Sequence, residues 1–526
     1  MHRRGQRGEA GRGHARLRYP DRVRGERQGT QAGPVVRAAL GAPAGLRRAG
    51  AGVRRRRGQA GLPAAVGGRP GAFPGRRRVT RAGFLSSALV EDGRVDADVF
   101  LKERSASAAY DVTEVPLASL GAWHLGERLV HSSGRFFTVE GLAVRTNHGR
   151  APSWRQPIIV QPEIGILGIL VKRFDGVPHF LMQVKMEPGN TSLVQYAATV
   201  QATPSNYQRV HGGRSTPYLD YFLPSSRRRV LVDRLLSEHA AWYLHKRNRN
   251  MIVEVPPDED VPQYDDFAWL TLGQIRRQLA RGHVNMNART VLACISYAAG
   301  GTLPADDFHA AVVTSHRSHR SNADLAEAMT WLIDQKDRFT LEVRRVGLSE
   351  LDEWIADDQS IRHRDGDFFR VVGLSVAASS REVGCWTQPM LEPVPGNLVA
   401  FLCRRRAGVL EFLVQAMVQP GLTDRLELAA TIQLSPGLHR TGAAAPPLVE
   451  YLATAGPQVR HSSVQSEDGG RFLRADTRHV VVELTADRDI AVPPTHRWMT
   501  LGLLDRLVAA GYYVNVEARS LMACLL

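Results

Sequence analysis

The sequence of 526 residues has few of the features that mark several large classes of protein. Its four cysteines include no CxxC pair, which leaves the common zinc and dithiol motifs without support. No apolar run approaches the ~20 residues of a membrane-spanning helix. Two of the cysteines, Cys294 and Cys524, lie in apolar helical sequence, where buried free thiols are expected. These absences predict a cytoplasmic protein without membrane association.

Motifs for common cofactors and nucleophiles are missing as well. The sequence contains no GxGxxG after a strand, no GxxxxGK, no HExxH and no GxSxG. Nicotinamide-Rossmann, P-loop, zincin and α/β-hydrolase chemistry are therefore unsupported. We predict that the protein uses no cofactor and no metal.

The strong positive charge belongs to one end of the chain. The formal net charge is +16, yet residues 1–82 hold 21 Arg, no Lys and three acidic residues. The remaining residues include 47 basic and 49 acidic side chains, so they are close to neutral. A charge confined to one segment does not predict a nucleic-acid-binding domain in the rest of the chain.

This N-terminal segment is rich in Arg, Gly, Ala and Pro and has almost no aromatic residues. Such a composition cannot bury enough apolar surface to offset its ordering entropy, so residues 1–85 are expected to be disordered. The segment could bind polyanions, act as a targeting peptide, or reflect a start codon assigned upstream of the true one in a GC-rich gene. We favour the last interpretation, because the composition follows GC-rich codons.

Beyond the tail, one long pattern occurs twice. The sequence 180–189 returns at 412–421, and 134–142 returns at 366–374, both displaced by 232 positions. This period is far longer than the repeats of up to ~50 residues that build solenoids. We therefore expect two homologous domains, 86–303 and 321–526. The segment between them, 304–320, has no clear counterpart in the other half and is interpreted as a linker.

Each half is predicted to be an α+β module with a mixed, largely antiparallel sheet. Apolar alternation indicates a hairpin that turns at Asp175-Gly176 in the first half and at Ala407-Gly408 in the second. Further strands are expected, and helices are expected near the start and later in each half. The ranges are 193–202 and 426–434 for strands, and 95–103, 322–335, 228–246 and 272–281 for helices, the last capped by Thr271.

A dense polar segment runs from Gln183 to Gly213. Its two parts read Val-Lys-Met-Glu-Pro-Gly-Asn at 184–190 and Thr-Val-Gln-Ala-Thr-Pro-Ser-Asn-Tyr-Gln-Arg-Val-His-Gly-Gly at 199–213. Together they resemble the NDP-hexose 2,3-dehydratases of deoxysugar biosynthesis. Ala197-Ala198 stand where that family usually has Ser-Pro, a change that affects a turn and no chemical group. The resemblance covers essentially everything beyond the tail.

The resemblance implies two tandem modules of Nudix-like fold in a homodimer. It implies a lyase that removes water from C2 and C3 of dTDP-4-keto-6-deoxy-D-glucose and gives the 3,4-diketo-2,6-dideoxy sugar. A 3-ketoreductase would consume that product, and no cofactor is implied. A non-catalytic protein that binds or organises sugar nucleotides in the same pathway is the alternative.

The two copies differ at chemically active positions. Gln183, Thr199 and Gln201 persist in the second copy, whereas Lys185 becomes Met417 and Glu187 becomes Gln419. Asn190 also becomes Leu422, and His211-Gly212-Gly213 falls opposite three alanines. The first copy is therefore predicted to hold the catalytic site, and the second to be a degenerate module.

Elimination needs a base, an acid and cations for the diphosphate. Glu187 and His211 are the candidates for acid–base work, with Tyr207 and Lys185 beside them, and Lys185 could also bind the diphosphate. Each has a structural alternative: a turn-stabilising carboxylate, a loop histidine, a half-buried strand tyrosine and a solvated surface charge. The remaining residues predicted to contact substrate are Gln183, Asn190, Thr199, Gln201, Thr203, Asn206, Arg209, Gly212, Gly213 and Arg214.

Overall fold

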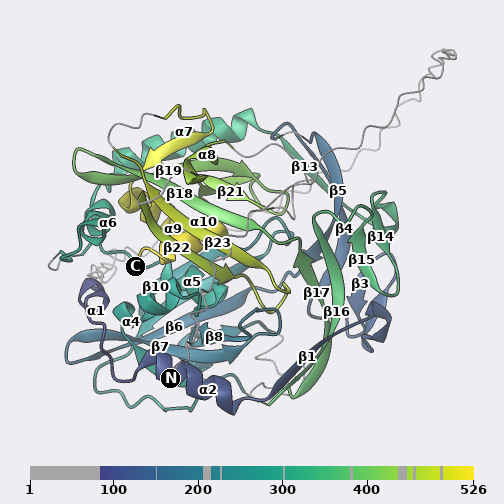
Figure 1. Ribbon diagram of the computed structural model, residues 1–526, viewed down its shortest axis with the longest axis horizontal. Helices are drawn as coiled ribbons and strands as arrows, with labels where there is room; N and C mark the ends of the chain where they lie inside the picture. The colour runs from purple at the N-terminus through teal and green to yellow at the C-terminus, as the bar shows by residue number, and fades with distance from the viewer. Residues whose placement is uncertain are drawn as a thin grey trace, which may run out of the picture. The chain divides into compact units, whose positions relative to one another are not determined.

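The structure is a computed structural model that describes residues 83–149, 151–204, 215–224, 228–299, 303–379, 383–435, 447–453, 458–485 and 490–526. By its contacts the chain divides into two units, residues 1–74 and 75–526, and every described residue belongs to the second. Figure 1 shows the arrangement of the helices and strands. We call residues up to 303 the first half and residues from 304 onward the second half.

The first half contains strands and helices that alternate in short runs. Its helices are α1 (Leu85–Ala88), α2 (Ala97–Ser107), η1 (Leu117–Ser119), η2 (Leu219–Tyr221), α4 (Leu272–Ala280) and α5 (Met286–Leu292). Its strands are β1 (Tyr110–Val115), β2 (Trp123–Leu125), β3 (Leu129–His131), β4 (Thr138–Thr146), β5 (Ser153–Val160), β6 (Gly165–Phe174), β7 (Val177–Met186), β8 (Val194–Ala197), β9 (Val200–Ala202), β10 (Arg229–Ser237), β11 (Arg247–Glu254) and β12 (Phe267–Leu270).

The second half repeats this succession of elements. Its helices are α6 (Asp307–Arg317), α7 (Asn322–Arg338), η3 (Leu348–Glu350), α8 (Glu450–Ala453), α9 (Leu501–Ala510) and α10 (Val516–Ala523). Its strands are β13 (Leu341–Val346), β14 (Trp354–Ala356), β15 (Ser360–His363), β16 (Phe369–Ala378), β17 (Cys385–Pro393), β18 (Asn397–Arg406), β19 (Val409–Val418), β20 (Leu426–Ala430), β21 (Ile432–Leu434), β22 (Val459–Ser466), β23 (Asp476–Glu483) and β24 (His496–Met499).

Each half builds one seven-stranded mixed sheet. In the first half the order is β10-β11-β6-β7-β12, with β8 on β7 and β9 on β6, and only β11 and β6 are parallel among these pairs. The second half repeats the pairing with β22, β23, β18, β19 and β24, and β18 with β23 is again the parallel pair. The predicted hairpins are confirmed: the turn residues Asp175, Gly176, Ala407 and Gly408 all have positive φ, as a tight hairpin turn requires.

Each of two further sheets includes one strand from the opposite half of the chain. Strand β1 of the first half pairs with β16 of the second, and β13 of the second half pairs with β4 of the first. Each of these five-stranded sheets therefore contains one strand from the opposite half. Figure 1 shows both sheets together at the right of the view, beside the two seven-stranded sheets. Apolar residues of both sheets share one core, which includes Trp123, Val139, Trp354 and Val371.

Helices from both halves pack against the seven-stranded sheets. Helices α5 and α10 contact each other, and apolar residues of α4, α5, α9 and α10 belong to one core with Phe180 and Phe412. The predicted cap of α4 is present, because the side chain of Thr271 accepts a hydrogen bond from the Gln274 N–H. The predicted mixed α+β class with mostly antiparallel sheets is confirmed.

The helix predicted at 228–246 is wrong. Residues 229–237 form strand β10, and residues 238–246 follow it without a helix. Val230 and Val232 pair with residues of β11, and β-branched side chains suit a pleated sheet better than a helix. The apolar spacing of this segment fitted a helix, but the neighbouring strand decides its conformation.

The segment 304–320, predicted to be a linker, contains helix α6. Ser315 of α6 donates to the Leu410 carbonyl and accepts from the Leu501 N–H. Ser87 in the first half donates to the Pro178 carbonyl and accepts from the Leu272 N–H in the same way. Buried residues of α6 lie in the main core, so this segment is the counterpart of α1 and part of the packed second half.

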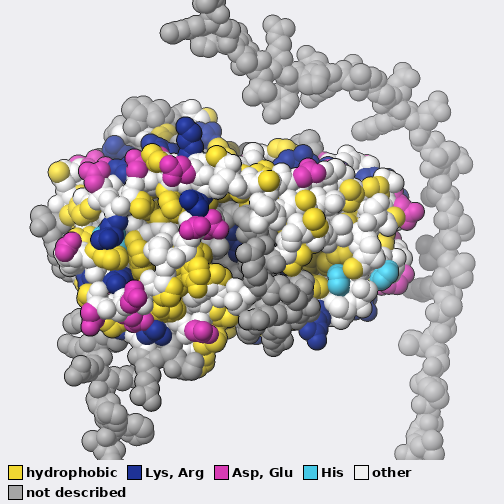
Figure 2. Space-filling model, turned by 90° about the horizontal axis from the view of Figure 1, so that it is seen from below, with side chains coloured by type: hydrophobic (Ala, Val, Ile, Leu, Met, Phe, Trp, Pro, Cys, Tyr) yellow, Lys and Arg dark blue, Asp and Glu magenta, His cyan; other side chains and the backbone are white. Residues whose placement is uncertain are grey.

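Charges on the described surface are mixed in sign. Figure 2 shows Lys and Arg side chains interspersed with Asp and Glu on the face in view, without a broad patch of one sign. Many are paired, such as Arg155 with Asp352 and Arg249 with Asp233. None of the helices within the described ranges is long and apolar enough to cross a membrane.

Candidate active site

Glu187 lies directly after strand β7, in the turn that leads to β8. Its side chain is 5% exposed, although glutamate is rarely so deeply buried unless it is paired. The backbone N–H of Glu187 donates to the Leu193 carbonyl at 2.8 Å, and its carbonyl accepts from the Asn190 N–H at 3.2 Å. These bonds fix the backbone of the turn, so the carboxylate has a defined position.

Two side-chain amides hold the Glu187 carboxylate. Gln201 Nε2 donates to Oε1 at 3.0 Å, and Asn190 Nδ2 donates to Oε2 at 3.3 Å. An ionised carboxylate can only accept hydrogen bonds, so two N–H donors suit its charged form. The three residues that the sequence placed together are therefore in contact.

Each amide is itself held by a further residue. Gln201 Oε1 accepts from Asn285 Nδ2 at 2.9 Å, and Asn285 caps helix α5 by accepting from the Ala288 N–H. Asn190 Nδ2 also donates to Gln195 Oε1 at 2.8 Å, and Gln195 Nε2 donates to the Gly282 carbonyl at 2.8 Å. The orientation of both amides is thus fixed by the helical layer below the sheet.

Gln195 and Asn285 were not among the predicted site residues. The sequence carries a signal for Asn285, because the second half repeats it as Asn515, whose Nδ2 donates to Gln433 Oε1 at 2.9 Å. Gln195 offers no such signal, since its counterpart is the chemically different Glu427. Neither contact follows from sequence spacing alone.

Strand β7 carries Gln183 and Lys185 on the face opposite the main core. They alternate with Met182, Val184 and Met186, which are buried in that core. Both are partly buried, and Lys185 lies opposite Gln195 in the register of β7 and β8. This face of β7 therefore carries two polar side chains that come, in the sequence, just before the turn that holds Glu187.

Thr199 has a structural role between strands. Its hydroxyl donates to the Leu181 carbonyl and accepts from the Leu170 N–H at 2.9 Å, which joins β7 to β6. Thr431 makes the same pair of bonds to Leu413 and Leu402 in the second half. Thr203 follows β9 and is partly buried.

The other predicted residues lie outside the described residues. They fall in 205–214 and comprise Asn206, Tyr207, Arg209, His211, Gly212, Gly213 and Arg214. Of the predicted set, the structure thus brings Glu187, Asn190 and Gln201 into direct contact. It places Gln183, Lys185, Thr199 and Thr203 on the same sheet or directly after it.

A buried charged cluster lies where the two halves meet, near this turn. Arg289 Nη2 is 3.5 Å from Glu467 Oε2, and His239 Nε2 is 3.1 Å from the same oxygen. His239 Nδ1 lies 3.3 Å from Glu517 Oε1. Burial disfavours the charged imidazole, but the two carboxylates outweigh it and raise the pKa of His239 to about 10. Burial opposes the charge of Glu467 too, yet His239 and Arg289 lower the pKa of that carboxyl to about 2.

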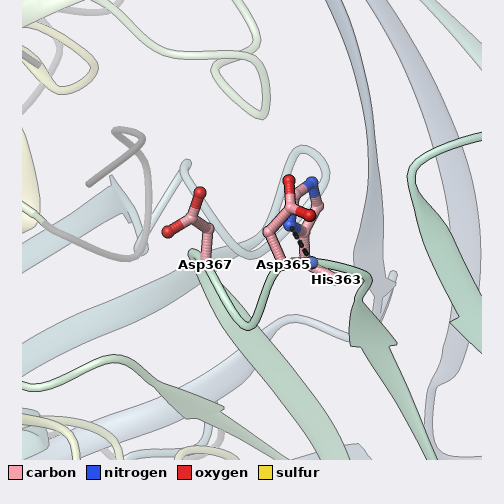
Figure 3. Close-up of side chains that lie close together, drawn as sticks. All are labelled: His363, Asp365 and Asp367. Carbon is pink, nitrogen blue, oxygen red and sulfur yellow. Dashed lines mark hydrogen bonds between the residues drawn. The ribbon is translucent and has the colours of Figure 1, made fainter. Parts of the chain in front are cut away.

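One further group in the described ranges has the residue types of a metal site. His363 ends β15, Asp365 and Asp367 follow it, and the possible ligand atoms of the three lie within 4.8 Å of one another (Figure 3). The Asp365 N–H donates to His363 Nδ1 at 3.3 Å, as the Ser133 N–H donates to His131 Nδ1 in the first half. Because the histidine supports the turn in both halves, we assign no metal to this group.

The second half lacks the ionisable groups of the turn. Gln419, the counterpart of Glu187, is buried, and neither of its amide atoms bonds to a described residue. Leu422 stands in place of Asn190 and is also buried. The amide pair of Asn515 and Gln433 persists, so the second half keeps the support but not the carboxylate.

Comparisons with known proteins agree with the resemblance of the polar segment. The family model described as NDP-hexose 2,3-dehydratase matches residues 95–295 and again 325–525. A protein of Saccharopolyspora spinosa named dTDP-4-dehydro-6-deoxy-alpha-D-glucopyranose 2,3-dehydratase is 45% identical over 84% of this chain and 94% of its own length. Proteins with the same name from Amycolatopsis orientalis and Streptomyces violaceoruber are each 42% identical, over 84% and 80% of this chain and 92% and 95% of their own lengths.

Proposed function

The chain belongs to the NDP-hexose 2,3-dehydratase family, and from this premise we propose that it acts on dTDP-4-keto-6-deoxy-D-glucose. The enzyme is a carbon–oxygen lyase that removes water from C2 and C3 and gives dTDP-3,4-diketo-2,6-dideoxy-D-glucose. The observation that carries this proposal is that both halves match the family and that the three relatives, each covered almost completely, have the same name.

The proposed reaction is an elimination that needs no hydride transfer. The C4 ketone acidifies the proton on C3, so a base removes it and an enolate forms. The C2 hydroxyl then leaves with a proton from an acid, which produces a C2–C3 double bond that carries the C3 hydroxyl. This enol takes a proton at C2 and becomes the C3 ketone, so the balance is the loss of one water.

We assign the base to Glu187. Its carboxylate is held by two N–H donors in a buried turn. Its counterpart in the second half is Gln419, whose side-chain amide does not act as a base at neutral pH. His211 and Tyr207 are the proposed acid and sugar-binding partners. Lys185, Arg209 and Arg214 are the proposed cations for the diphosphate, because their charges offset those of its oxygens.

Uncharged polar residues complete the proposed site. Gln183 and Thr203 would contact the substrate from the face of the sheet that carries Lys185. Asn206, Gly212 and Gly213 would contact it from the 205–214 segment. Asn190, Gln201 and Thr199 bond to the protein in the structure, so we propose that the first two orient Glu187 and that Thr199 joins the strands.

Several finer features are part of the same proposal. We propose that each half has a Nudix-like fold, that the protein is a cytoplasmic homodimer and that it uses no cofactor or metal. We also propose that a 3-ketoreductase consumes the product. Residues 1–82 are proposed to be dispensable for activity, so their deletion should leave turnover unchanged.

The decisive experiment incubates the full-length protein with dTDP-4-keto-6-deoxy-D-glucose and a 3-ketoreductase that traps the product. We expect a 2-deoxy sugar nucleotide, detected by mass spectrometry as the loss of one water before reduction. Binding of the substrate without any 2-deoxy product would favour the alternative of a non-catalytic sugar-nucleotide-binding protein.

A further inference from the structure

The turn that holds Glu187 is covered by a loop from the opposite half. Residues 467–474, which we call the covering loop, lie on Gly189 and Asn190. The Gly189 N–H donates to the Gly469 carbonyl at 2.8 Å, and the Arg474 N–H donates to the Gly189 carbonyl at 2.7 Å. The second half therefore forms one wall of the turn that carries the proposed base.

The same contact exists in reverse. In the second half the Gly421 N–H donates to the Ala240 carbonyl at 2.7 Å, and the His245 N–H donates to the Gly421 carbonyl at 2.8 Å. A Cβ on Gly189 would lie 1.8 Å from the Phe472 carbonyl oxygen, and one on Gly421 would lie 1.8 Å from that of Tyr243. The two backbones thus approach equally closely, so each contact is a structural control for the other.

Among their differences, the two contacts differ at a pair of residues that face each other across the contact. Asn190 faces Gly469 in one contact, and their counterparts in the other contact are Leu422 and Ala240. A Cβ on Gly469 would lie 2.2 Å from Asn190 Oδ1 and 2.5 Å from its Cγ. Gly469 does not have a φ in the left-handed region, so its lack of a side chain provides space and not backbone freedom.

Asn190 cannot easily move away from an added methyl group. Its side chain is 4% exposed, and its Nδ2 bonds to both Glu187 and Gln195. Its Oδ1 points at Gly469 and accepts no hydrogen bond from any described residue, so only the Nδ2 bonds define the orientation of the amide. A side chain at 469 would push the amide out of the orientation that bonds to Glu187.

We propose that Gly469 is a positioning residue for Glu187 and acts through Asn190. The second half then contributes to the chemistry of the first half, because the missing side chain of Gly469 leaves room for the Asn190 amide. This inference rests on the proposed role of Glu187 as the base, and it concerns the geometry that the base requires.

The test is a cycle of variants in the full-length protein. Gly469→Ala should lower kcat roughly 10- to 100-fold, the scale of a misplaced catalytic group, while KM for dTDP-4-keto-6-deoxy-D-glucose stays within about threefold. Asn190→Ala should also lower kcat. If Gly469 acts only through Asn190, adding Gly469→Ala to Asn190→Ala should change kcat by less than about twofold.

Ala240→Gly is the matched control, because it alters the same position in the reverse contact without touching the proposed site. It should leave kcat and KM unchanged. The inference is overturned if Gly469→Ala retains the kcat of the wild type, or if Ala240→Gly lowers kcat as much as Gly469→Ala does. It is also overturned if Gly469→Ala lowers kcat by the same factor in the wild type and in Asn190→Ala. Should Gly469→Ala alone fail to fold, the double variant compared with Asn190→Ala gives the same decision.

The thermal midpoints of the same four proteins separate this inference from the proposed function. If the wild type produces no 2-deoxy sugar, the proposed function fails. The contact is still tested, because Gly469→Ala should lower the midpoint of the wild type and not that of Asn190→Ala. An equal loss in both backgrounds would refute the contact, whatever the activity.

Discussion

Arg289 and Glu467 form an ion pair that joins the two halves inside the protein. The guanidinium is completely buried, its partner is 2% exposed, and 3.5 Å separates Arg289 Nη2 from Glu467 Oε2. The same guanidinium donates to the Ser520 hydroxyl, the Val284 carbonyl and the Ser466 carbonyl. Glu467 begins the covering loop, so this pair anchors the loop beside the turn of Glu187.

We expect Arg289→Met to lower the free energy of unfolding by about 3–5 kcal/mol, because it removes one partner of a buried pair. Urea denaturation at neutral pH measures the change. The exposed pair of Arg155 and Asp352 is the control, and Asp352→Asn should cost less than about 1 kcal/mol. A cost as small for Arg289→Met would contradict this account of the cluster.

His239 should make the stability depend on pH at the alkaline side. Its pKa in the folded protein is about 10, above the ordinary value of 6.5. Its stabilising charge is therefore fully present below about pH 6.5 and is lost as the pH rises towards 10, at most about 1.4 kcal/mol per pH unit. Denaturation of the wild type and His239→Gln from pH 6 to 10 checks this. The difference between them should shrink as the pH rises, and a constant difference would refute the assignment.

Glu187→Gln should abolish most turnover with little effect on the fold. The loss of a catalytic base lowers kcat by roughly 10²- to 10⁴-fold. The midpoint of thermal unfolding should change little, since the second half accommodates Gln419 at the equivalent buried position. Gln419→Ala is the control and should keep the activity of the wild type. Full activity in Glu187→Gln would require another base.

Thr199→Val should destabilise the protein without weakening substrate binding. The substitution leaves the buried Leu170 N–H without its acceptor, which costs about 1–3 kcal/mol. Thr431→Val should cost a similar amount, because Thr431 makes the matching bonds in the second half. Denaturation and KM together decide the role: a large rise in KM for Thr199→Val alone would make Thr199 a substrate contact.

The sequence was a good guide to local structure. The hairpin at Asp175-Gly176 and the cap at Thr271 could be predicted because turn and cap preferences depend on neighbouring residues. The conformation of 228–246 depends on pairing with β11, and the packing of 304–320 depends on Leu410 and Leu501, so local patterns do not predict either one. Such partners are distant in the sequence.

The same limit applies to the site. Comparison of the halves makes Glu187 and Asn190 candidates, since a duplicated chain shows which polar residues the fold can lose. The comparison could not reveal that Gln201 and Asn285 form a chain of bonds to the carboxylate, nor that Gly469 faces Asn190. Those relations depend on how the halves dock, which one-dimensional spacing does not encode.

The first strand of each half, β1 or β13, completes the outer sheet of the other half, so neither outer sheet is complete without both halves. A single copy of this sequence would have to pair that strand with its own outer sheet or exchange it with a second copy. Because both copies lie in one polypeptide, a mutation can alter the site of one copy and leave the other intact.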